Sequence, residues 1–179
     1  MVWVIDTQAF WNVIGQYNQN TIAIQVVLLI LTVSAVALSY TGKVNFSAKI
    51  MLGVVNLFIG IVFFGCYGTE PIQKFFALPL YISCGVIFLY EAWVNKNDRL
   101  EKPNAFQISM LALYCLYPII SYMLANKFPQ MVTHIMPCPV VSLSITAYAG
   151  YAHKNKVLLA LLTVWGLTGI KSVIFNAYE

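Results

Sequence analysis

The residues best suited to chemistry lie close together in segment 131–138, which contains Met131, His134, Met136 and Cys138. Thioether, imidazole and thiolate groups are the ligands that soft or borderline metals such as Cu(I) and Zn(II) prefer, so His134 and Cys138 are candidate metal ligands. No CxxC motif and no second histidine lies nearby, and Met and Cys are also common packing residues. A soft metal ion is therefore not the favoured interpretation, and the cofactor stays open.

Cys138 could also serve as the nucleophile of a membrane thiol enzyme. No resolving cysteine adjoins it, and the sequence has no HExxH motif and no phosphate-binding glycine loop. Paired acids at membrane depth, which a proton relay would need, are missing from the sequence as well. We therefore expect the protein not to be an enzyme.

Two prolines flank Cys138 in the order Pro137-Cys138-Pro139. Within a continuous helix, each proline would remove a backbone donor and leave a carbonyl four residues earlier without a partner. Lipid cannot satisfy such groups, so they must be buried in protein or face water. Because proline suits the first turn of a helix, we predict that a helix begins at Pro137 and that residues 131–136 dip in from outside as a loop or half-helix. A simple proline kink is the alternative.

Other polar side chains fall inside the hydrophobic stretches, and they either line a cavity near Pro137 or hydrogen-bond between helices. Tyr117 precedes Pro118, where we expect a second broken helix. The predicted binding residues are Gln25, Asn56, Tyr117, Pro137, Cys138, Pro139 and Ser142.

The elements that must position these residues follow from the composition, which is 60% hydrophobic and only 9% charged. A chain this short of charge cannot cover a surface that faces water, so its solvent is lipid. We predict an all-α polytopic integral membrane protein, with residues 1–20 as an N-terminal interfacial segment and residues 21–179 as a six-helix transmembrane domain. The six predicted spans are Thr21–Tyr40, Ile50–Tyr67, Phe76–Val94, Phe106–Leu124, Val132–Tyr151 and Val157–Phe175, the fifth broken at its prolines.

Basic residues are distributed unevenly over the connections between these spans. Because cytoplasmic loops carry an excess of Lys and Arg, we predict that loops 41–49, 95–105 and 152–156 are cytoplasmic and that both termini lie outside the cell membrane. The first, third and fifth connections hold Lys43, Lys49, Lys96, Arg99, Lys102, Lys154 and Lys156, against Lys74, Lys127 and, inside the last span, Lys171 on the other side.

Several short motifs resemble those of an uncharacterised family of bacterial multi-pass membrane proteins, a domain of unknown function. They are "YNQNTIAIQ" at 17–25, Tyr117-Pro118, "PCP" at 137–139, and Trp165 with Gly169. Two departures are Ile22-Ala23, where the family usually has Trp-Pro, and Val140-Val141, where it usually has two threonines. Members often continue into one more hydrophobic segment. The resemblance implies a membrane protein and supplies no activity.

Two functions agree with these features. The favoured one is a small permease or channel for a small solute or ion, with its site near the broken fifth helix. The alternative is a structural or regulatory membrane subunit that acts through partner proteins or lipids. Expected partners are the lipid bilayer and a second copy of the chain in a homo-oligomer. The lysines are scattered along the chain and form no basic patch, so we expect no nucleic-acid binding.

Overall fold

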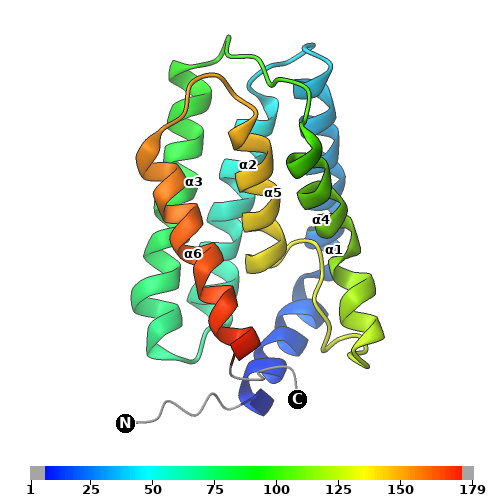
Figure 1. The fold of residues 1–179 in the computed structure, drawn as a ribbon. Coiled ribbons are helices and arrows are strands. Elements are labelled where there is room, and N and C mark those ends of the chain that lie inside the picture. Colours follow the sequence, from blue (N-terminus) through cyan, green and yellow to red (C-terminus); the bar gives the residue numbers. More distant parts are fainter. Residues whose placement is uncertain (1–6, 175–179) are drawn as a thin grey trace.

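The computed structural model describes the backbone of residues 7–174 and the side chains of residues 8–168. It confirms the predicted all-α class (Figure 1). Two π-helical segments, η1 (Ile59–Tyr67) and η2 (Gln73–Ala77), lie on either side of the connection between the second and third helices. The six α-helices are α1 (Thr7–Tyr40), α2 (Ser47–Phe58), α3 (Leu78–Val94), α4 (Ala105–Met123), α5 (Pro137–Ala149) and α6 (Lys156–Ile174).

Four helical stretches are long and apolar enough to cross a membrane, namely Gln8–Tyr40, Ser47–Tyr67, Gln73–Val94 and Ala105–Met123. Helix α5 has only 13 residues, as expected of a fifth span that is broken at its prolines. At 1.5 Å per residue it is about 20 Å long, against about 30 Å of hydrocarbon. The part of α6 with described side chains is also a shorter apolar helix.

The boundary expected at residue 20 is not a break in the structure. Helix α1 runs for 34 residues from Thr7 to Tyr40, so the described part of the predicted interfacial segment forms its first turns. No proline occurs in this range to stop the helix. The position of these first turns at a membrane surface stays a prediction.

The prediction of a broken fourth helix is wrong. Helix α4 continues from Ala105 to Met123 with Pro118 inside it. One proline removes one donor, and a membrane helix tolerates this where neighbouring groups satisfy the freed carbonyl.

Helices α2 and α3 approach each other closely through glycines. A Cβ atom added to Gly85 would lie 2.6 Å from Cγ of Leu57 and 2.9 Å from the carbonyl oxygen of Gly53. Small residues of this kind are what allows helix backbones in membranes to come close together.

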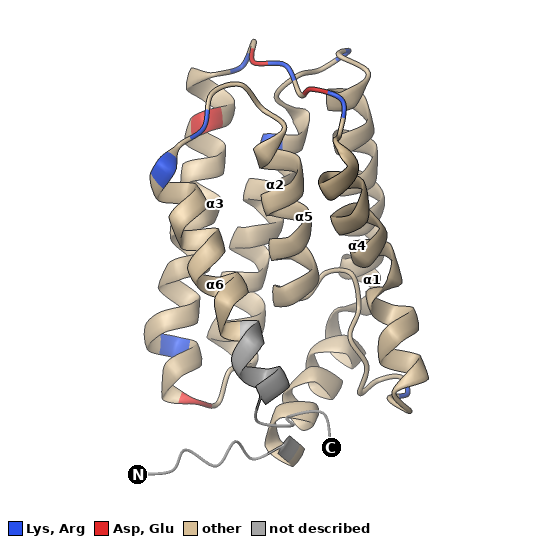
Figure 2. Cartoon of the chain, viewed as in Figure 1, with Lys and Arg blue, Asp and Glu red and all other residues tan. Residues whose placement is uncertain are grey.

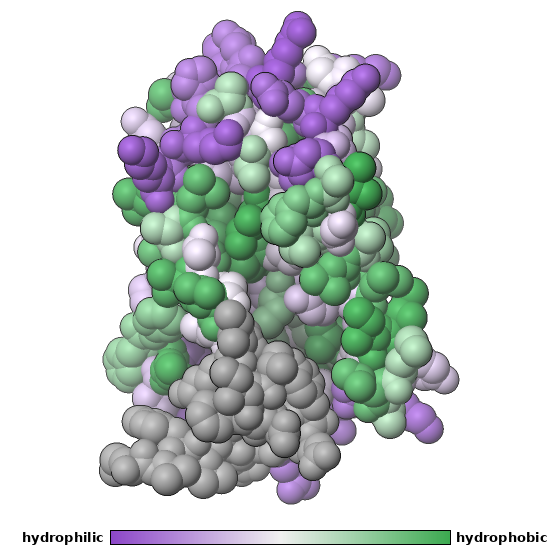
Figure 3. Space-filling view, in the orientation of Figure 1, coloured by the Kyte–Doolittle hydropathy of each residue, from purple (hydrophilic) through white to green (hydrophobic). Residues whose placement is uncertain are grey.

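The two ends of the bundle differ in charge. Figure 2 shows most Lys and Arg residues at the end where α1 joins α2, α3 joins α4 and α5 joins α6. Figure 3 shows a hydrophilic cap at that end and a largely hydrophobic surface below it on the same face. Lys74 lies in η2, next to the α2–α3 connection, and Lys127 lies in the α4–α5 connection, so both belong to the opposite end; the side chain of Lys171 is outside the described residues. The predicted asymmetry therefore exists in three dimensions.

Candidate functional site

Helix α5 begins at Pro137, as predicted. The preceding Met136 is extended, with φ −131° and ψ 164°, so the prolines occupy the first and third positions of the helix. The first amides of a helix have no acceptor within it, so neither proline costs a hydrogen bond. The amide of Val140 donates to the Met136 carbonyl oxygen at 3.0 Å and starts the helical pattern.

The loop 124–136, which leads into α5, is held by side chains of α1. The Asn18 amide donates to the carbonyl oxygens of Pro129 and Met131 at 2.7 and 2.8 Å. The Tyr17 hydroxyl donates to the carbonyl oxygen of Ile135 at 2.6 Å. Tyr17 and Asn18 are both fully buried. Three backbone carbonyls of this irregular segment are thus satisfied by protein.

Gln25 belongs to the same network. Its amide nitrogen donates to Asn18 Oδ1 at 3.1 Å and to Thr21 Oγ1 at 2.9 Å. Its oxygen accepts from the Thr133 hydroxyl at 2.6 Å. The structure therefore brings Gln25 to the loop before Pro137, where protein groups occupy the hydrogen-bonding positions that a ligand would need.

Tyr81 of α3 holds the start of α5. Its hydroxyl donates to the Pro137 carbonyl oxygen at 2.8 Å, and its side chain is fully buried. A chain of ring contacts joins this tyrosine to α1 and α6. Successive ring centroids are 4.9, 5.0, 5.2 and 5.2 Å apart along Tyr17, Phe63, Phe64, Tyr81 and Trp165.

Asn56 contacts a different side of α5. Its amide donates to Ser144 Oγ at 3.2 Å and to the Leu52 carbonyl oxygen at 2.8 Å. Residues two apart in a helix point in nearly opposite directions, so Ser144 and Ser142 face different sides of α5. The predicted binding residues therefore do not form one site, because Asn56 is separated from Ser142.

A second group of predicted residues gathers on the side of α5 that includes Cys138 and Ser142. The Cys138 thiol and the Tyr117 hydroxyl are electrostatic neighbours of the Tyr81 hydroxyl. Cys138 is exposed, and Ser142, one turn later, is partly exposed. The His134 ring packs against Tyr114 of α4, with ring centroids 5.2 Å apart.

Three buried polar atoms on α5 and on the two helices that pack against it, α4 and α6, have no hydrogen-bond partner within the described part of the chain. They are the Tyr114 hydroxyl, Ser142 Oγ and Trp165 Nε1, one from each of α4, α5 and α6. Helix α5 packs against both of the other helices. We call the region around these three atoms and the Cys138 thiol the α5 site.

The described side chains do not complete a metal site here. No group of three or more His, Cys, Asp and Glu residues that could hold a metal ion occurs among them. His134 and Cys138 would supply two ligands, whereas a structural zinc ion takes four.

The structure has a cavity beside the loop 124–136. It has a volume of about 440 Å³ and lies between the first turns of α1 and residues 125–130. The tightly hydrogen-bonded loop separates this cavity from the α5 site.

The chain matches one known protein family over nearly its whole length. A model described as a family of unknown function (DUF6064) matches residues 7–179. The chain belongs to this family. No curated protein and no solved structure matches it. The resemblance to an uncharacterised family, drawn from the motifs at residues 17–25 and 137–139, is thus confirmed.

The structure shows what those motifs do in this family member. Tyr17, Asn18 and Gln25 of the first motif bind the loop that ends at the second motif. The sequence analysis missed the part played by Tyr17 and Asn18. The signal was present, because Asn18, Thr21 and Gln25 follow helical spacing and mark one polar stripe on an apolar helix.

A second polar cluster, at the end rich in basic residues, was also missed. Lys49 Nζ lies 3.3 Å from Asp98 Oδ2, with the two side chains 0% and 4% exposed, and 4.3 Å from the centre of the Tyr151 ring. The buried Glu91 accepts hydrogen bonds from the amides of Asn95 and Asn155. These contacts join α2 and α3 to both neighbouring connections. Lys49 had been counted only as a loop charge.

Proposed function

We propose that the protein is a multi-pass membrane protein that acts as a small permease or channel, and that its solute passes through the α5 site. The role is non-enzymatic. The supporting observation is the set of three buried polar atoms without partners that α4, α5 and α6 contribute near the start of α5.

Unpaired polar atoms are costly in a protein interior. Each buried group without a partner destabilises the fold by about 1–3 kcal/mol, and native proteins keep few of them. A solute or a file of water molecules that passes along α5 would offer partners to these atoms. In many transporters, the substrate site likewise lies where a helix begins part-way across the membrane.

The chemistry of the α5 site favours an uncharged polar solute. The indole of Trp165 can only donate a hydrogen bond, whereas the hydroxyls of Tyr114 and Ser142 can donate and accept. Cys138 and Tyr117 add two more neutral groups. A small molecule with hydroxyl or carbonyl oxygens would match these groups, and none of them offers the fixed charge that an ion pair requires.

The proposed orientation places the basic end of the bundle in the cytoplasm. Six exposed basic residues occupy the three connections at that end, and the opposite end has two in its described part. Such an excess is typical of cytoplasmic loops. The loop 124–136 then enters from the outer side.

Solute flux through reconstituted liposomes tests this function. Purified protein is inserted into liposomes, and the rate of swelling is followed by light scattering for glycerol, urea and related small neutral solutes. We expect faster uptake than in protein-free liposomes for at least one solute. Ser142→Phe should return the rate to the protein-free value, because its ring would fill the α5 site.

A matched control is Ser109→Phe, because Ser109 is exposed on α4 and bonds only its own helix at the Ala105 carbonyl. This variant should keep the wild-type rate. If no neutral solute in the series enters faster than in protein-free liposomes, the permease proposal is wrong.

The second candidate, a structural or regulatory subunit, has one observation in its favour. Only 17% of the α4 span is buried, which leaves a long apolar side for lipid or another membrane protein. Chemical cross-linking in native membranes distinguishes the two, because a subunit should form defined adducts with another protein or with its own copy. Cross-linked adducts together with an absence of solute flux would favour this candidate.

A further inference from the structure

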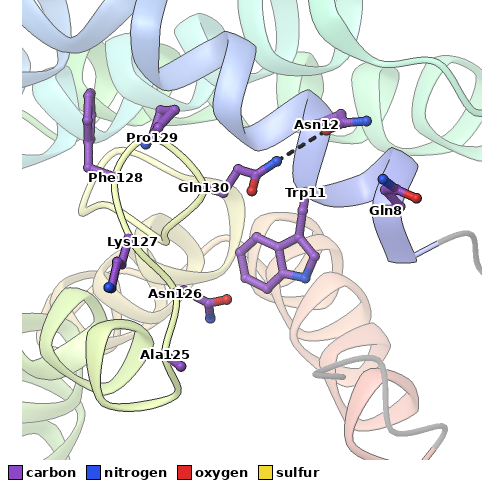
Figure 4. Close-up of a pocket in the computed structure, with 9 residues that line it drawn as sticks. All are labelled: Gln8, Trp11, Asn12, Ala125, Asn126, Lys127, Phe128, Pro129 and Gln130. Atoms are coloured by element: carbon purple, nitrogen blue, oxygen red, sulfur yellow. Dashed lines mark hydrogen bonds between the residues drawn. The ribbon is translucent and has the colours of Figure 1, made fainter.

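The cavity between α1 and the loop is a second candidate site, independent of the α5 site. Its volume of about 440 Å³ falls in the range of small-molecule sites in proteins, about 300–1,000 Å³. Figure 4 shows its lining residues, with the Asn126 amide pointing toward the Trp11 ring. They are Gln8, Trp11, Asn12, Ala125, Asn126, Lys127, Phe128, Pro129 and Gln130.

The walls of this cavity are held in place by hydrogen bonds. The Asn18 amide fixes the Pro129 carbonyl, and the Gln130 amide donates to Asn12 Oδ1 at 3.1 Å. The backbone N–H of Asn126 donates to the Ser121 carbonyl oxygen at 3.2 Å and closes the turn after α4. The cavity therefore has a defined shape before any ligand arrives.

The chemistry of the lining suits a phosphate-bearing headgroup. Four amide side chains supply both donors and acceptors, and Lys127 supplies the only formal charge. No ion pair involves Lys127 within the described residues, and the lining contains no carboxylate. A lysine ammonium and amide N–H groups that line the same cavity are both donors that attract phosphate oxygens. The Trp11 indole is of the type that sits at headgroup level in membranes.

The surroundings of the cavity indicate that the phosphate belongs to a lipid. Phe128 lines the cavity and is also 53% exposed. Three more apolar or aromatic side chains are exposed at the end of α4 and the start of the loop: Tyr122, Met123 and Leu124, at 64%, 78% and 54%. Acyl chains could follow this apolar surface while the headgroup lies in the cavity.

We propose that the cavity between α1 and loop 125–130 binds the phosphate headgroup of a phospholipid, with Lys127 pairing with the phosphate and Trp11 packing against the headgroup. The site faces the outer side in the orientation proposed above. The bound lipid would lie beside the loop that leads into α5. Lipid binding here does not depend on whether a solute passes through the α5 site.

Native mass spectrometry of delipidated protein in neutral detergent tests the proposal. Phosphatidylglycerol is titrated into the wild type and into Lys127→Gln and Trp11→Leu. We expect Lys127→Gln to bind the lipid about fivefold more weakly, since one basic residue near a lipid headgroup contributes about 1 kcal/mol. Trp11→Leu should also bind more weakly than the wild type, because it loses the ring that packs against the headgroup. Lys74→Gln is the matched control, because Lys74 is exposed at the same end of the bundle outside this cavity. It should bind like the wild type.

Glycerol phosphate, which has the headgroup chemistry without acyl chains, identifies the source of the phosphate. It should bind far more weakly than the lipid. If glycerol phosphate binds as tightly as phosphatidylglycerol, the ligand is a free phosphorylated solute and the lipid assignment is wrong. If Lys127→Gln and Lys74→Gln bind the lipid equally well, the cavity is not the binding site.

Discussion

The hydroxyl of Tyr17 gives the sharpest test of how the loop before α5 is held. Tyr17→Phe keeps the buried ring and its contacts with Phe63 but removes the donor to the Ile135 carbonyl oxygen, 2.6 Å away. That carbonyl is buried and has no position in a helix, so it loses its partner. Leaving one such group unsatisfied costs about 2 kcal/mol. For a chain of this size, we expect the melting temperature to fall by about 4–8 °C.

Tyr81→Phe is the informative comparison. It also removes a buried donor, to the Pro137 carbonyl oxygen. Pro137 is the first residue of α5, however, and its carbonyl has the amide four residues later as a helical partner. The cost should be about 1 kcal/mol, the net value of one hydrogen bond. Tyr90→Phe, at a site 58% exposed, should change little.

Thermal unfolding of purified protein in detergent, followed by tryptophan fluorescence, ranks the three variants. Limited trypsin digestion adds a local measurement, because Lys127 lies in the loop and Tyr17→Phe should speed cleavage after it. If Tyr17→Phe has the same melting temperature as Tyr90→Phe and trypsin cleaves it no faster than the wild type, the loop does not depend on this hydrogen bond.

Four further changes test other parts of the structure. Ala125 has a φ of 67° in the turn after α4, a conformation that glycine adopts without strain. Ala125→Gly should therefore raise the free energy of unfolding by up to about 1 kcal/mol, and a lower melting temperature would contradict this. Gly85→Ala should lower the free energy of unfolding by about 1–3 kcal/mol, because the added Cβ atom would collide with α2. A lower melting temperature would show this. Asp98→Ala should lose about 3–5 kcal/mol by leaving Lys49 buried without its partner, and adding Lys49→Met should restore most of the melting temperature. Arg99→Cys should react with an impermeant maleimide only after cells are permeabilised, and labelling in intact cells would reverse the proposed orientation.

Composition was enough to predict the all-α class, and proline chemistry was enough to predict where α5 starts. Pro137 can begin a helix but cannot continue one without losing a donor, so local rules decided that boundary. Pro118 shows the limit of the same rules. A single proline leaves the choice between a break and a continuous helix to tertiary neighbours, which the sequence does not display.

The candidate site was harder to predict because apolar helices carry little information about which faces meet. Gln25 and Asn56 both looked like cavity residues, yet one binds the loop before α5 and the other binds Ser144 on a different side. Lys49 looked like a loop charge, and only the fold brings Asp98 to it. These pairings depend on contacts between residues 49 to 108 positions apart, which periodicity within one helix cannot supply.

The shortness of α5 has a consequence for how the chain is made. A helix of 13 residues is too short to be recognised as a membrane span from its own hydrophobicity. The side chains that bond the loop before it are Tyr17, Asn18 and Gln25, and Tyr81 bonds the first residue of α5 itself. All four precede the loop in the sequence. They have therefore been synthesised before the ribosome reaches α5. In the proposed membrane setting, we therefore expect α5 to insert by docking onto the helices that precede it.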